Sequence, residues 1–244
     1  MAEVPSLRRE TRYGIPAADQ ILFNRYYLVG YSYYFRQAKW ALEIMSSDRQ
    51  YIHPEEVKRI DKFRPDFRIP EMFRADLDVY EHSGFARGHL IASADKLETE
   101  LQNSETFLLS NMSPQKQSFN SGIWSQLESE VRRLDSDKKV YETYVLSGPI
   151  FDFDKKVKSI GSEEDKGIPI PIPPAYFKSV LTENNRGKLK MWSFIIPNKK
   201  ADKPLADYRV STEMVERFAG IQLWERLMGV KMEKEKKKIN KMWS

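Results

Sequence analysis

Residues Ser118 to Leu134 form the stretch that most restricts how this chain can fold. Its apolar residues recur at spacings of three and four, which predicts a helix with one apolar face: Ile123, Trp124, Leu127, Val131 and Leu134. An apolar helix face has to be buried against another layer of secondary structure. The stretches on both sides of this helix have the composition of strands, so we expect the helix to pack on a sheet.

The strand pattern favours an α+β fold with a largely antiparallel central sheet flanked by helices. The predicted strands are a hairpin of 26–35 with 39–44, then 140–150, then a second hairpin of 176–181 with 190–196. Further helices are predicted over 17–24 and 54–60, and from Ser211 in two pieces to Met228. The stretches 151–167 and 197–208 are expected to be loops, and 168–174, which is rich in proline, to be extended.

No break in composition divides the chain, so we predict a single domain over residues 1–230 followed by a basic C-terminal tail over 231–244. Lys231 to Trp243 contains six lysines and two glutamates. Such a segment either adds salt-sensitive attraction to a polyanion or is a solvated helix end, and the sequence leaves both interpretations open.

Several classes of protein are excluded or disfavoured by what the sequence lacks. There is no apolar run long enough to span a membrane, so no membrane partner is expected. The absence of cysteine removes thiolate ligands and nucleophiles and favours a hard ion such as Mg2+ over zinc. The first residues do not form a secretory signal. Localisation stays open: secreted or periplasmic if a signal peptide was removed, otherwise intracellular or mitochondrial-type.

The chain has three histidines, and their settings differ. His53 and His82 lie in polar stretches and are most simply surface or loop residues. His89 follows Arg87-Gly88 and precedes Leu90-Ile91, so it is expected where the chain enters the apolar interior. It could be a general base or a buried histidine hydrogen-bonded to the backbone.

Three residues of the predicted helix could also take part in chemistry. Asn120 could cap the helix or hold a hard metal ion. Glu128 and Arg132 are four residues apart and could form an ordinary helical ion pair. None of these residues is specific alone. Their ordered combination with His89 is specific.

That combination consists of three motifs: Ala86-Arg87-Gly88-His89, Ser110-Asn111-Met112-Ser113-Pro114-Gln115, and Asn120-Ser121-Gly122-Ile123-Trp124 leading to Glu128. In motif order and intervals the chain resembles the DNA/RNA non-specific endonucleases, a family with the ββα-metal (His-Me finger) fold that includes secreted bacterial and mitochondrial nucleases. The resemblance covers most of the chain up to about Phe194. It implies a Mg2+-dependent endonuclease that cleaves DNA and RNA without sequence preference and leaves 5′-phosphorylated products.

The resemblance also implies a role for each residue. His89 corresponds to the general base and Asn120 to the direct ligand of one Mg2+, with Mn2+ as a substitute. Glu128 corresponds to the residue that holds the ion through water. Arg87 and Arg132 correspond to phosphate contacts. Members of the family are often homodimers, so a homodimer is an open alternative.

The assignment of the family's upstream arginine is looser than the others. Arg59 is the first candidate, and its spacing to Arg64 and Asp66 permits more than one alignment.

Ala86 departs from the family pattern, which has aspartate at this position. Alanine accepts no hydrogen bond from metal-bound water, so we expect attenuated activity. The alanine is either a natural variant or a deliberate substitution. Two other functions stay open: a catalytically dead relative that binds nucleic acid, and a phosphodiesterase for a small or lipid substrate.

Overall fold

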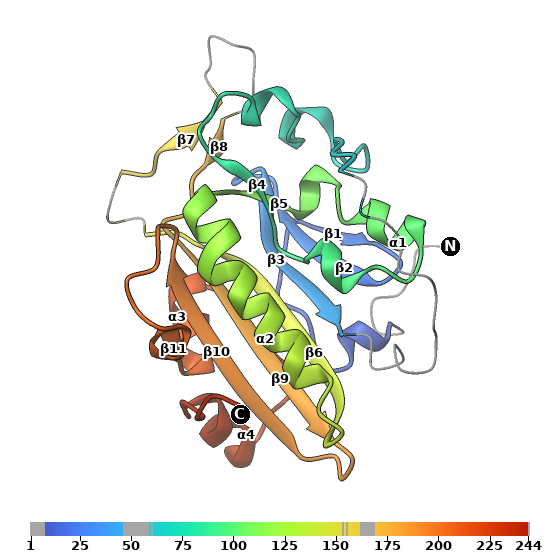
Figure 1. The fold of residues 1–244 in the computed structure, drawn as a ribbon, viewed down its shortest axis with the longest axis vertical. Coiled ribbons are helices and arrows are strands. Elements are labelled where there is room, and N and C mark those ends of the chain that lie inside the picture. Colours follow the sequence, from blue (N-terminus) through green and yellow to red (C-terminus); the bar gives the residue numbers. More distant parts are fainter. Residues whose placement is uncertain are drawn as a thin grey trace.

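The computed structural model describes residues 8–45, 59, 61–152, 154, 156–161 and 169–243, and its centre is a seven-stranded antiparallel sheet (Figure 1). The strand order is β1-β2-β3-β6-β9-β10-β11. The strands are β1 (Gln20–Phe23), β2 (Tyr27–Ser32), β3 (Gln37–Ile44), β6 (Val140–Ile150), β9 (Ala175–Asn184), β10 (Leu189–Pro197) and β11 (Arg209–Val210). Neighbours in the sequence mostly pair directly, which confirms the predicted α+β class.

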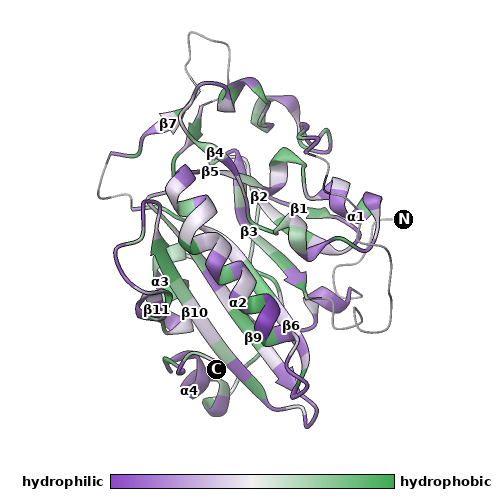
Figure 2. Ribbon diagram, viewed as in Figure 1, coloured by the Kyte–Doolittle hydropathy of each residue, from purple (hydrophilic) through white to green (hydrophobic). Residues whose placement is uncertain are grey.

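The sheet is covered on both faces because successive residues of its strands point in opposite directions. Val145 and Val180 face the helix α2 (Ser125–Asp135), which buries Leu127 and Val131 against them. Tyr144, Leu146 and Leu181 face the other side, where Val215 of α3 (Thr212–Ala219) and the buried Trp224 pack. In Figure 2, β10 is mostly hydrophobic, whereas the tip of the β9–β10 hairpin is hydrophilic.

A smaller antiparallel pair, β4 (Ala86–His89) and β5 (Met112–Gln115), leads into α2 and completes a ββα unit. Short helices connect it: η4 (Glu71–Phe73), η5 (Asp78–Tyr80), η6 (Ser93–Asp95), α1 (Glu100–Glu105) and η7 (Leu109–Asn111). Residues of β5 and η5 share an apolar cluster with a second small pair, β7 (Ser159–Ile160) and β8 (Ile170–Pro171). This cluster joins the ββα unit to the β7–β8 pair, and a separate cluster packs Leu90, Ile91 and Leu127 against the large sheet.

The predicted helix over 118–134 is present but is not regular throughout. Its first part, Phe119–Trp124, is a π-helix in which Gly122 has φ −103° and ψ −112°, and regular α-helix starts at Ser125. Asn120 therefore lies in a distorted turn before α2. Widened helical turns of this kind are frequent at functional sites.

Two predicted helices are wrong. Residues 20–23 of the expected 17–24 helix form β1, because pairing with β2 supplies the hydrogen bonds of Gln20–Phe23. The second piece of the helix from Ser211 is absent: α3 ends at Ala219 and is followed by Gly220, which has φ +65°. A different helix, α4 (Val230–Lys236), follows later. Most of the predicted 54–60 helix lies outside the described residues.

The basic C-terminal segment packs against the domain. Lys236 is 3% exposed, and its Nζ donates hydrogen bonds to Glu216 Oε1 at 2.8 Å and to the Leu223 carbonyl at 2.7 Å. The Trp243 ring contacts Trp192 edge-on at 5.2 Å. Across the described part of the chain, no helix is both long enough and apolar enough to cross a bilayer.

Candidate active site

One open cavity of about 640 Å³ collects every residue that the sequence singled out for chemistry. It lies between β4, the π-helical turn and α2. Its lining includes Arg59, Ala86, Arg87, His89, Asn120, Glu128 and Arg132. These residues come from three separate stretches of the chain, at residue 59, residues 86–89 and residues 120–132, so only the tertiary fold brings them together.

His89 ends β4 and stands against an aromatic wall. Its ring centre lies 5.8 Å from that of Phe63 and 5.1 Å from that of Phe107, which it meets edge-on. Burial is the main cause that lowers the pKa of His89 to about 3; the nearby charge of Arg59 acts in the same direction, and that of Asp61 opposes it. The imidazole is therefore neutral across the physiological pH range.

The two ring nitrogens of His89 are not equivalent. Nε2 is buried and has no hydrogen-bond partner within the described chain. Nδ1 is the nitrogen left to face the cavity, and a neutral imidazole can accept a proton there. This geometry fits a general base better than a histidine held by a backbone hydrogen bond.

The other motif residues fix the backbone around His89. A side chain on Gly88 would overlap that of Gln115, with 2.1 Å between its Cβ and Gln115 Cδ, so any larger residue would displace the buried Gln115 side chain. The Asn111 amide accepts from Ile91 N–H and donates to the Ile91 carbonyl, both at 3.0 Å. Trp124 Nε1–H donates to the His89 carbonyl at 3.3 Å. The position of His89 is thus tied to β5 and to the start of α2.

Asn120 and Glu128 are two of the side chains with oxygen donors that line the cavity. Among the described residues the Asn120 side-chain amide has no hydrogen-bond partner, although its backbone N–H donates to the Lys116 carbonyl. The described ranges contain no group of three or more His, Asp and Glu side chains that could hold a metal ion. An amide with one nearby carboxylate fits Mg2+, which keeps several waters when bound to protein.

Glu128 lies among buried charges. Burial raises its pKa to about 7, an increase opposed by the charges of Lys178 and Arg132 and reinforced by Asp95 and Glu43. Lys178 on β9 donates to Ser147 Oγ at 2.7 Å, and its Nζ lies 4.5 Å from the centre of the Trp124 ring. Burial lowers the pKa of Lys178 in turn.

Each of the three arginines has a neighbour that restrains it. Arg132 pairs with Asp95 at 2.7 Å, so the ion pair expected with Glu128 is replaced by one with η6. The guanidinium carbon of Arg87 lies 5.2 Å from the Phe63 ring centre. The third, Arg59, donates a hydrogen bond from Nε to Asp61 Oδ1 at 2.6 Å.

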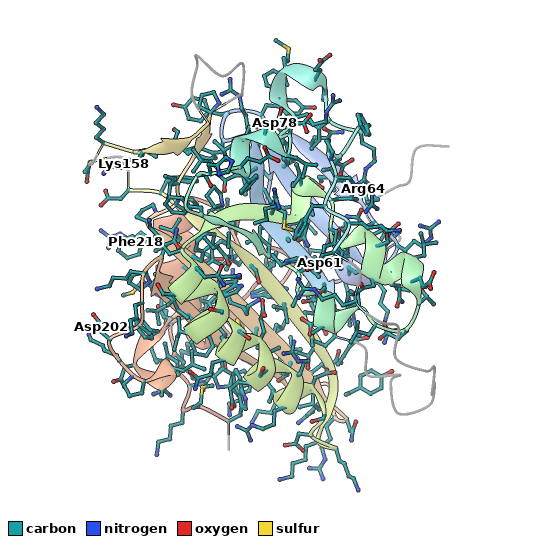
Figure 3. The ribbon with its side chains drawn as sticks, turned by 45° about the horizontal axis from the view of Figure 1, so that its top comes forward. Asp61, Arg64, Asp78, Lys158, Asp202 and Phe218 are labelled. Carbon is teal, nitrogen blue, oxygen red and sulfur yellow. The ribbon has the colours of Figure 1, made fainter. Side chains whose placement is uncertain are left out.

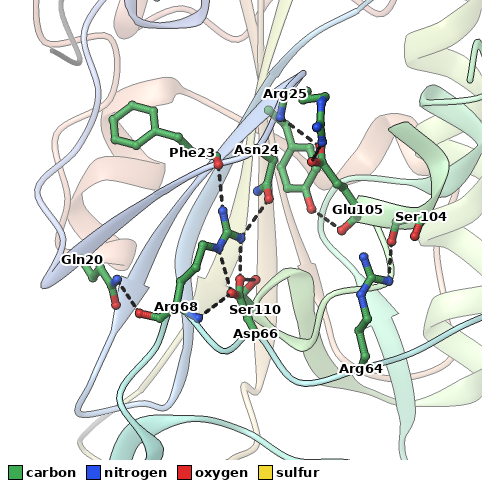
Figure 4. Close-up of polar contacts among 11 residues, drawn as sticks. Gln20, Phe23, Asn24, Arg25, Arg64, Asp66, Arg68, Ser104, Glu105 and Ser110 are labelled. Carbon is green, nitrogen blue, oxygen red and sulfur yellow. Dashed lines mark hydrogen bonds and ion pairs between the residues drawn. The ribbon is translucent and has the colours of Figure 1, made fainter. Parts of the chain in front are cut away.

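The alternative alignments of the upstream arginine find no support in the geometry (Figure 4). Arg64 donates to the Ser104 carbonyl at 2.8 Å. Asp66 is buried, pairs with Arg68 at 2.6 Å and accepts from Ser110 Oγ at 2.7 Å. Neither Arg64 nor Asp66 lines the cavity, whereas Arg59 does.

Sequence reasoning missed several contributors to this site. Tyr80, Glu81 and His82 line the cavity, and His82 has φ +54°. Asp95 and Lys178 set the charge around α2, but each looks like an ordinary polar residue in the sequence. The best available signal was Lys178 itself, a charged residue within the mostly apolar predicted strand Tyr176 to Leu181.

Comparison with known proteins gives a consistent result. A profile of the family described as DNA/RNA non-specific endonuclease matches residues 5–228. Mitochondrial endonuclease G of Caenorhabditis elegans is 32% identical over 228 residues, covering 88% of this chain and 71% of that protein. Nuclease C1 of Cunninghamella echinulata var. echinulata is 30% identical, and the match covers 91% of this chain and 90% of that protein. A chain in the crystal structure of the EndoG/EndoGI complex superposes with a TM-score of 0.82 at 29% identity, covering 93% of this chain and 94% of that one.

Proposed function

The chain belongs to the DNA/RNA non-specific endonuclease family, and from that premise we propose a Mg2+-dependent hydrolysis of phosphodiester bonds with His89 as general base. One observation carries this proposal: His89, Asn120 and Glu128 line the same cavity, although they come from β4, the π-helical turn and α2. Hydrolysis needs a base for the attacking water and a way to neutralise the charge that grows on the phosphoryl oxygens. The cavity offers groups for both.

His89 accepts the proton of the attacking water at Nδ1. Its pKa of about 3 keeps it neutral and able to accept. A phosphodiester anion beside the ring stabilises the imidazolium and raises that pKa during the reaction. The rings of Phe63 and Phe107 pack against the imidazole, and no described residue accepts a hydrogen bond from its buried nitrogen, Nε2.

Asn120 would hold the metal ion directly, and Glu128 would hold it through water. The free amide of Asn120 and the carboxylate of Glu128 support Mg2+, with Mn2+ as a substitute. When bound, the ion would neutralise charge on the phosphoryl oxygens and would favour protonation of the departing 3′ oxygen by water. The fragments then carry 5′ phosphates.

Arg59, Arg87 and Arg132 would contact phosphate oxygens around this centre. Arg132 Nη1 donates to Asp95 Oδ1 at 2.7 Å and Nη2 donates to Ser129 Oγ at 3.0 Å, so the guanidinium is held in place at the cavity wall. Contacts with phosphate carry no sequence information, so they support cleavage of both DNA and RNA without sequence preference.

Ala86 lines the cavity where the family has aspartate, and we propose that this alanine attenuates the reaction. In its place no carboxylate can orient metal-bound water. The second candidate function is a relative that binds nucleic acid without cutting it, and Ala86 is the observation that favours it.

An assay of plasmid DNA and of RNA with Mg2+, Mn2+, Ca2+ and EDTA tests the proposal. We expect nicking with Mg2+ or Mn2+, none with EDTA, and none by the His89→Ala form. Binding without metal-dependent cleavage, in both the chain and its Ala86→Asp form, would support the binding protein instead. Preferential hydrolysis of a small phosphodiester added in competition would favour the phosphodiesterase alternative.

DNA and RNA are the proposed partners, and light scattering of the purified chain distinguishes a monomer from the homodimer expected by resemblance. Relatives named as mitochondrial include endonuclease G of Caenorhabditis elegans and nuclease 1 of Schizosaccharomyces pombe. Fungal nucleases such as nuclease C1 are similar to the chain to the same degree, so the comparisons fit both a mitochondrial-type and a secreted location. Fractionation of cells that express the native protein distinguishes the two.

A further inference from the structure

A second hollow adjoins the active-site cavity and shares a wall with it. This groove of about 370 Å³ is lined by Phe85, Lys116, Asp152, Lys156, Val157, Lys158, Ile172, Pro173, Pro174 and Asn198. Phe85 also lines the active-site cavity, immediately before the motif that begins at Ala86. A chain-like substrate that leaves the cavity past Phe85 therefore enters the groove.

The groove carries an excess of positive charge. Lys116, Lys156 and Lys158 are exposed, and Asp152 is the one acidic residue in the lining. None of the three lysines forms an ion pair with another described residue. Lys158 projects from the edge of the molecule (Figure 3). Binding of an anion by unpaired lysines costs little free energy, because no existing ion pair has to be broken.

The floor of the groove is rigid and fixed to the catalytic unit. Asn198 accepts from the Lys116 N–H at 2.8 Å and donates to the carbonyls of Pro114 and Pro173 at 3.0 and 2.9 Å. Lys116 follows β5 directly, and its Nζ lies 4.0 Å from the Phe85 ring centre. The groove therefore keeps a fixed position relative to His89 and Asn120.

We propose that the groove is an extended binding surface for the sugar-phosphate backbone, and that a strand cut in the active site continues over Phe85 onto Lys116, Lys156 and Lys158. The proposal rests on the proposed function, because it takes nucleic acid as the substrate. Lysine contacts with phosphate are independent of sequence and sensitive to salt. The surface thus adds affinity for long substrates and none for a substrate that fills only the cavity.

The test uses Lys156→Glu/Lys158→Glu, with Lys138→Glu/Lys139→Glu as a control of equal charge change. Both control lysines are exposed in the turn between α2 and β6 and line neither hollow. Affinity for a labelled 20-base-pair duplex is measured in EDTA by fluorescence anisotropy over a salt series. We expect the groove variant to bind about tenfold more weakly and its salt slope to fall by roughly two. The control should change less than twofold.

Equal weakening in both variants, or no weakening in the groove variant, would overturn the proposal. A second readout is hydrolysis of bis(p-nitrophenyl) phosphate, which can fill only the cavity and should be cleaved equally by all three proteins. Failure of the proposed function is recognised separately, because neither the chain nor its Ala86→Asp form would then show metal-dependent cleavage in any assay.

Discussion

His89 and Glu128 line the same cavity but stand in opposite surroundings. His89 lies against the rings of Phe63 and Phe107. The wall behind Glu128 contains two cations and two acids: Lys178, Arg132, Asp95 and Glu43. Burial favours the neutral form of both groups, so it lowers the pKa of His89 to about 3 and raises that of Glu128 to about 7.

The difference shows that one physical cause has opposite consequences for the two groups. A base has to be neutral before it accepts a proton, so an apolar wall is sufficient for His89. A carboxylate that holds a cation has to be charged, so Glu128 needs compensating cations. Four predictions test this contrast between an apolar and a charged wall.

The largest effect is expected from His89→Ala. Loss of a general base typically lowers the rate by about 10²–10⁴-fold, so kcat for plasmid cleavage should fall by about 10³-fold. Affinity for DNA in EDTA should be unchanged, because the arginines remain. A loss of binding that parallels the loss of activity would mean that His89 acts in substrate binding.

Lys178→Met should weaken the charged wall alone. Removing the main charge that lowers the pKa of Glu128 leaves this carboxyl more protonated at neutral pH. The Mg2+ concentration for half-maximal activity should rise by about 10–100-fold at pH 7 and recover partly at pH 9. Lys178→Arg is the matched control and should restore much of the loss, and thermal melts check that each variant folds. An equal defect at both pH values would contradict this explanation.

Ala86→Asp should add a carboxylate at the family position, and we expect at least about a tenfold gain in Mg2+-dependent cleavage. The physical reason is an additional acceptor for metal-bound water. Ala86→Asn, which has a similar size and no charge, separates charge from shape. Equal rates for the unmodified chain and its Ala86→Asp form would show that this position does not limit the reaction.

The smallest effect concerns stability at acid pH. The folded-state pKa of His89 is lowered below its usual value, so the unfolded chain binds more protons between about pH 6.5 and pH 3. His89 thus contributes stability that is complete above pH 6.5 and lost as the pH falls. Between pH 6.5 and 4.5 the free energy of unfolding of the unmodified chain should fall by about 1–2 kcal/mol more than that of the His89→Ala form, as measured by urea unfolding. Parallel losses in both proteins would contradict a buried neutral imidazole.

The sequence by itself determined the features that depend on local pattern. The spacing of Ile123, Leu127 and Val131 predicted α2, and the hairpin around Glu183–Gly187 was correct because its strands pair with sequence neighbours. The spacing failed to predict the distortion at Gly122, since glycine permits several backbone conformations. It also failed for Gln20–Phe23, whose strand depends on pairing with β2.

Only the tertiary structure decided which side chains meet. The motifs identified His89, Asn120 and Glu128, but their common cavity arises from packing β4 and β5 against α2. The pairing of Arg132 with Asp95 and the burial of Lys178 depend on elements far apart in the chain. Periodicity records whether a residue is buried, whereas pKa and ion pairing depend on neighbours that distant segments bring into contact.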